Sequence, residues 1–161
     1  DTNKISPLFG HWEETLIWSC LQGIMGKIYA NDLTAPTAAM AVIGDFTFFA
    51  GEPCPELIAY RPPHCTQNFM IAVPQNKLWE NMLTQFYGKK AKIISRYATK
   101  KEPPIFNKHH LEKIVASLPK QYTLSMIDSH FYKLCKSEAW SKDLVSQFST
   151  YEKYRLSLIH I

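Results

Sequence analysis

Apolar residues recur every three or four positions in several segments of the chain, which is the period of an amphipathic helix. The helices predicted in this way are residues 11–23, 74–88, 107–119, 128–135 and 141–158. In the third of them, Asn107 is expected to cap the N-terminus. Leu111, Ile114, Val115 and Leu118 follow the i, i+3, i+4, i+7 pattern, so we expect them to lie in the core.

Shorter apolar runs without that period predict strands. The predicted strands are residues 26–31, 37–43, 46–50, 68–74, 91–101 and 122–128. Strands that alternate with helices of ten or more residues favour an α/β arrangement of the α+β kind, in which helices pack on a mixed sheet. At 161 residues and 46% hydrophobic composition, the chain is long enough to build one such core.

The longest apolar run, AAMAVIGDFTFFAG, is interrupted once, by Gly44 and Asp45. A Gly-Asp pair between two apolar runs is typical of a two-residue hairpin, and a bulge in one long strand is the alternative. Either structure lets the carboxylate of Asp45 bond free backbone N–H groups or reach water. A catalytic role for Asp45 is the second interpretation of this position.

The segment GKKAKIISRYATKK carries six basic residues and no acid. If residues 91–101 are extended, Lys92 and Arg96 lie on one face and form a candidate site for an anion. A solvated sheet edge guarded by lysines is the structural alternative. Because the aromatic residues are not interleaved with this cluster, and the net charge is only +4, we expect no nucleic-acid partner.

The four cysteines, at positions 20, 54, 65 and 135, form no CxxC pair, and we interpret them as reduced thiols. His64 and Cys65 are adjacent, but no second close pair completes a zinc site, so no metal is expected. A nucleophilic cysteine with a histidine base is not excluded by sequence alone. The segment QFYGKK partly matches a pyrophosphate-binding loop, but it follows a helix C-terminus, where the helix dipole has the wrong sign for an anion.

No apolar run approaches the ~20 residues that a membrane span needs, and the opening DTNKISPLFG lacks the regions of a signal peptide. We therefore expect a soluble, cytoplasmic protein with no membrane partner. The sequence does not define its oligomeric state.

An ordered series of segments resembles one known family. The series is WSCLQGIMGKIYAND, TAPTAAMAVIGDFTFFAGEP, MIAVP, KLWENMLTQFYG, RYATKKE, IFNKHHLEKIVASLP, Tyr122–Asp128 and AWSKDLVSQFSTYEKY. It is similar to the N-terminal part of the GNAT-type acetyltransferases of Gram-positive bacteria that are related to zwittermicin A resistance proteins. The resemblance runs from about Trp12 to Tyr154.

This resemblance implies transfer of an acetyl group from acetyl-CoA to a small-molecule amine, with acetyl-CoA bound by a C-terminal half that the sequence lacks. Residues 1–156 are then expected to form a single domain, the substrate-side or scaffolding half, and 157–161 a truncated or non-native end. The segment alone is expected to be inactive, and no catalytic residue carries over to it. Asp45, Glu52 and Tyr97 are the candidate substrate contacts, and a non-catalytic module that binds an anionic ligand is the alternative function.

Overall fold

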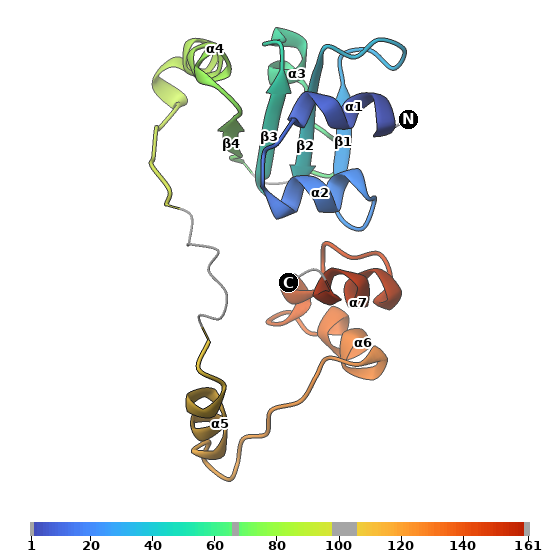
Figure 1. Ribbon diagram of the computed structural model, residues 1–161, viewed down its shortest axis with the longest axis vertical. Coiled ribbons are helices and arrows are strands. Elements are labelled where there is room, and N and C mark those ends of the chain that lie inside the picture. Colours follow the sequence, from blue (N-terminus) through green and yellow to red (C-terminus); the bar gives the residue numbers. More distant parts are fainter. Residues whose placement is uncertain (1, 66–67, 98–105, 160–161) are drawn as a thin grey trace.

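The structure is a computed structural model that describes residues 2–65, 68–97 and 106–159, with the side chains described as far as residue 156 (Figure 1). The described part contains a four-stranded mixed sheet and seven α-helices. This α+β fold confirms the predicted class. No helix among the described residues is long and apolar enough to cross a membrane.

The sheet has the strand order β1-β2-β3-β4, so each strand lies beside its neighbours in the sequence. The strands are β1 Lys27–Ala30, β2 Ala38–Ile43, β3 Phe46–Gly51 and β4 Ile71–Pro74. The first three strands are antiparallel, whereas β4 runs parallel to β3 after a long connection. Both inner strands are buried almost throughout, because helices cover both faces of the sheet (Figure 1).

One face of the sheet is covered by α1 (Thr2–Phe9) and α2 (Thr15–Leu21). Every second residue of the inner strands points to this side, and Phe48 packs there against Phe9 and Ile17. The sequence pattern does not predict α1, which has a proline inside it and few apolar positions.

The other face is covered by α3 (Pro55–Ala59) and α4 (Lys77–Tyr87). Trp79 is fully buried against Phe49, and its indole Nε1 donates to the carbonyl oxygen of Gly51 at 2.9 Å. The side chain of Asn76 caps α4, and Gly88, with φ of +52°, ends it as predicted.

The C-terminal third is helical and lies beyond one end of the sheet (Figure 1). Its elements are α5 (Lys108–Ala116), α6 (Ser129–Ser137), the 3₁₀ helix η2 (Lys142–Leu144) and α7 (Tyr151–Ile159), whereas the short 3₁₀ helix η1 (Gly88–Lys90) directly follows α4. Tyr132, Val145 and Tyr154 form a small core of their own between α6 and α7. The Lys153 ammonium donates to the carbonyl oxygen of Gly23 at 2.8 Å, which ties this unit to the turn before β1.

Three of the sequence predictions for this region are wrong. Residues 91–97 and 122–128 are irregular and exposed rather than extended in a sheet, and residues 98–101 lie outside the described residues. An apolar alternation forms a strand only where a neighbouring strand completes its hydrogen bonds, and none lies beside these segments in the described chain. The helix expected from Ser141 to 158 is also interrupted, because Thr150 starts a new helix by accepting the N–H of Lys153.

The helix predicted at 107–119 is confirmed as α5, with the Asn107 cap accepting the N–H of His110. Its predicted core face is not buried: Leu111, Ile114, Val115 and Leu118 are 41–49% exposed. α5 stands apart from the sheet (Figure 1). The period of a helix shows which face is apolar, but not whether another element covers that face.

Candidate functional site

The Gly-Asp interruption is the turn of the β2–β3 hairpin. Ile43 pairs with Phe46, so Gly44 and Asp45 are the two turn residues, and Gly44 has a φ of +54°. A glycine with positive φ at the first turn position, followed by a residue of negative φ, is typical of a II′ turn. The hairpin alternative is therefore correct, and the bulge is not.

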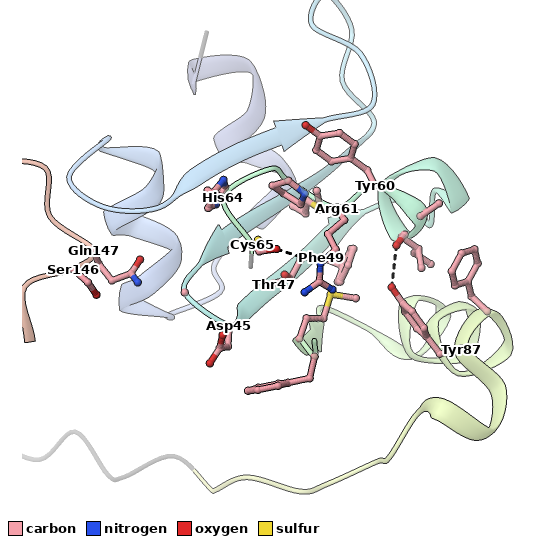
Figure 2. Close-up of a pocket in the computed structure, with 18 of the residues that line it drawn as sticks. Asp45, Thr47, Phe49, Tyr60, Arg61, His64, Cys65, Tyr87, Ser146 and Gln147 are labelled. Atoms are coloured by element: carbon pink, nitrogen blue, oxygen red, sulfur yellow. Dashed lines mark hydrogen bonds between the residues drawn. The ribbon is translucent and has the colours of Figure 1, made fainter. Parts of the chain in front are cut away.

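Asp45 is half-buried at this turn, and its carbonyl oxygen accepts the N–H of Ile71 at 2.7 Å, where β4 begins. Its side chain lies at a cavity of about 420 Å³ on the α3/α4 side of the sheet (Figure 2). Met40, Thr47 and Phe49 of the inner strands form the floor of this cavity. The main chain thus holds the Asp45 backbone at the edge of the cavity, and its carboxylate is one of the groups that line it.

Segments that are distant in sequence form the walls of the cavity. They are the end of α3 with the following loop (Ile58–Pro62, His64 and Cys65), Phe69–Met70, the end of α4 (Phe86–Tyr87) and three polar residues of the C-terminal unit, Asp143, Ser146 and Gln147. The Tyr87 hydroxyl donates to the carbonyl oxygen of Ile58 at 3.1 Å and joins two of these walls. The cavity is therefore a product of the tertiary fold.

The loop after α3 brings a cation and a histidine to the cavity. Arg61 Nε donates to the carbonyl oxygen of Cys65 at 3.4 Å. Nδ1 of His64 lies 3.4 Å from the hydroxyl of Tyr29, whose ring stacks on the imidazole. His64 is exposed, but some desolvation of its ring, together with the charge of Lys27, lowers its pKa below the ordinary value of 6.5. The imidazole is therefore largely neutral at pH 7.

Neutral His64 can accept a proton. In the tautomer that carries its proton on Nδ1, this nitrogen donates to the Tyr29 oxygen and leaves Nε2 as an acceptor. Burial raises the pKa of Tyr29, so the phenol keeps its proton at pH 7. His64 is thus a candidate general base at the cavity.

The structure does not bring the predicted site residues together. Asp45 lines the cavity, but Glu52 is exposed after the opposite end of β3 and does not line it. Tyr97 is 94% exposed, in the irregular segment after η1. Lys92 is exposed in the same segment, and Arg96 lies over the ring of Phe46, 5.2 Å from its centroid.

Sequence reasoning missed Arg61, Asp143 and Gln147 as cavity residues and considered His64 only as a metal ligand or a partner for a cysteine. The sole local signal was the proline-bounded loop RPPHC, since such loops often carry functional side chains. Asp143 and Gln147 come from a unit almost a hundred residues away from the hairpin, and no local pattern connects the two.

All four cysteines are unpaired. Burial raises the pKa of the Cys20 thiol to about 12, and its Sγ packs against β2, so it behaves as a small apolar side chain. Among the described residues, no three His, Cys, Asp or Glu side chains gather as metal ligands.

Comparison with known proteins gives one family and one solved structure. Residues 6–158 match the family model described as GNAT acetyltransferase. The fold is similar to the crystal structure of a GCN5-related N-acetyltransferase-like protein from Streptococcus suis 89/1591, with a TM-score of 0.76 and 38% identity. The match covers 96% of this chain and 61% of that one, so this chain spans less than two thirds of its relative. No curated protein matches the chain.

Proposed function

Because this chain belongs to the GNAT acetyltransferase family, we propose that the protein of which it forms a part transfers an acetyl group from acetyl-CoA to an amine held in the cavity beside β3. The observation that carries this proposal is the position of Asp45, a half-buried carboxylate in a cavity lined by both polar and apolar side chains. An ammonium group gains from such a carboxylate, while the hydrocarbon part of the substrate gains from the partly buried apolar wall of Phe69, Met70 and Phe86. The ordered segments quoted above support the zwittermicin A resistance-like branch of the family.

His64 has the protonation state that the chemistry needs. An amine attacks a thioester only as the free base, so its proton must pass to a group that is itself unprotonated at neutral pH. The lowered pKa of His64 supplies such an acceptor at Nε2, with Tyr29 holding the ring through Nδ1. Asp45 orients the ammonium, and His64 accepts the proton.

Neither end of α4 fits acetyl-CoA. Its pyrophosphate needs convergent N–H groups at a helix N-terminus, whereas the partial match around Gly88 follows the C-terminus of α4. The turn before α4 offers no alternative, because the side chain of Asn76 already occupies the N–H groups of Leu78 and Trp79. We therefore propose that the acetyl-CoA site lies in a further part of the protein.

Two observations support such a further part. The Streptococcus suis chain extends over 39% of its length beyond the match. The apolar face of α5 is 41–49% exposed, although an amphipathic helix normally buries this face. We propose that the further part carries the cofactor site and covers this face of α5. Sequencing the gene on both sides tests this, and a coding sequence no longer than this chain would refute it.

The test of function is an acetyl-transfer assay on the protein encoded by the whole gene, following release of the CoA thiol with a panel of amines. Asp45→Asn should raise KM for the amine about fivefold, the size of one partly exposed charge pair, with less effect on kcat. Glu52→Gln is the matched control, because this carboxylate follows the other end of the same strand. Equal effects of the two substitutions would refute the placement of the amine at Asp45.

A further inference from the structure

The cavity also holds a cation. Arg61 lines it together with Asp45 and Asp143, and its Nε bond to the carbonyl oxygen of Cys65 limits where the guanidinium can lie. Figure 2 shows Arg61 beside Cys65 and in front of β3, with Asp45 at the hairpin end of that strand. Charges of both signs therefore border one cavity.

Arg61 has no carboxylate partner within the part of the chain that the structure describes. The ion pairs there are Lys77–Glu80 and Lys108–Glu112, so Arg61 pairs with neither Asp45 nor Asp143. Its Nε is engaged, but within the described residues the two terminal nitrogens make no hydrogen bond, and these are the groups that bind a carboxylate in a bidentate arrangement. The guanidinium is available to a ligand that enters the cavity.

We infer that the amine acceptor also carries a carboxylate, and that it is an amino acid with an apolar side chain. The ammonium lies at Asp45, the carboxylate at Arg61, and the apolar side chain against Phe69, Met70 and Phe86, which line the cavity and are only partly buried. This inference rests on the proposed function and adds the substrate class. Arg61 becomes the residue that separates amino acids from simple amines.

The contribution of Arg61 is selectivity rather than high affinity, because the residue is exposed and water screens the charges at the cavity mouth. An exposed pair of this kind changes affinity about fivefold. Desolvation by the bound ligand and the two-pronged geometry both act to increase this factor.

Three ligands that share one phenyl group separate the two charges. They are L-phenylalanine, which has both charges, phenethylamine, which lacks the carboxylate, and 3-phenylpropanoate, which lacks the ammonium. Each is titrated into the 161-residue chain, and binding is followed by NMR chemical shifts or calorimetry. Phenylalanine should bind about fivefold more tightly than either of the other two.

The variants Arg61→Gln and Asp45→Asn test which protein residue binds which charged group of the ligand. Arg61→Gln should reduce phenylalanine affinity to that of phenethylamine and leave phenethylamine unchanged. Asp45→Asn should reduce it to that of 3-phenylpropanoate. Lys113→Gln is the control, because it removes an exposed cation on α5 that does not line the cavity.

The outcomes distinguish a failure of the amino-acid inference from a failure of the proposed function. If phenethylamine binds wild type as tightly as phenylalanine does, the amino-acid inference is wrong, while an amine site at Asp45 stands. If 3-phenylpropanoate alone binds, the cavity is an anion site, and both the inference and the amine site are wrong. If none of the three ligands binds, the amino-acid inference and the amine site are both wrong as well.

Discussion

Gly51 stands where β3 meets both α4 and the strand beside it, and Gly51→Ala should destabilise the protein strongly. Its φ is +78°, and a Cβ there would lie 2.2 Å from the carbonyl oxygen of Thr37, a backbone atom that cannot turn aside. The same residue donates its N–H to Gln75 and accepts the indole N–H of Trp79. A shift of this backbone therefore disturbs the anchor of α4 as well.

Two terms set the magnitude. Placing an alanine in the left-handed region costs about 1–2 kcal/mol, and overpacking against a fixed neighbour costs about 1–3 kcal/mol more. The expected loss is therefore about 2–5 kcal/mol in the free energy of unfolding. Gly23→Ala is the matched control, since its φ of +67° carries the same strain but a Cβ there has no atom within 4 Å.

Urea unfolding followed by tryptophan fluorescence measures both variants. The difference between them isolates the steric clash and should be about 1–3 kcal/mol. Near-UV circular dichroism adds a second readout, because a shifted Trp79 environment should change the aromatic signal of Gly51→Ala and leave that of Gly23→Ala unchanged. Equal losses in the two variants would show that the backbone at Thr37 yields, and would refute the reasoning.

Three further predictions rest on burial and pKa. In urea melts, Ile17→Ala should lower the free energy of unfolding by about 2–5 kcal/mol, whereas Ile114→Ala, on the exposed face of α5, should lower it by less than about 1 kcal/mol. A similar loss in both variants would show that this face of α5 is packed. A thiol reagent at pH 8 should label half-buried Cys65 in the native protein. Cys20 is buried and has a pKa of about 12, so it should be labelled only when the protein unfolds. Rapid labelling of Cys20 in the native protein would contradict its burial. His64 has a lower pKa folded than unfolded, so its stabilising effect is complete above about pH 6.5 and is lost as the pH falls through the folded value. Urea melts of His64→Gln should therefore show a weaker loss of stability below pH 6.5 than the wild type, and parallel profiles would refute the shift.

Where a segment finds its partners close by, the sequence predicted its structure. Residues 37–51 contain both strands and the turn of one hairpin, so the apolar runs and the Gly-Asp pair predicted either a hairpin turn or a bulge at Asp45, and the structure shows the hairpin. The caps Asn76 and Asn107 act on N–H groups two or three residues away, and the helices that follow them were predicted correctly.

Where the partner is distant, the same kind of pattern was not enough. Residues 91–97 and 122–128 have apolar content suited to a strand, but a strand exists only through bonds to a neighbour, and the face of α5 is core only where something covers it. The cavity likewise brings together residues that are far apart in the sequence. Asp45 comes from a hairpin, Arg61 and His64 come from the loop after α3, and Asp143 comes from the C-terminal unit. Local hydrogen bonding and periodicity are properties of a short stretch of chain, so they can be predicted from its residues. Contacts between remote segments arise only when the whole chain packs, and for this reason the side chains that share the cavity are known only from the folded structure.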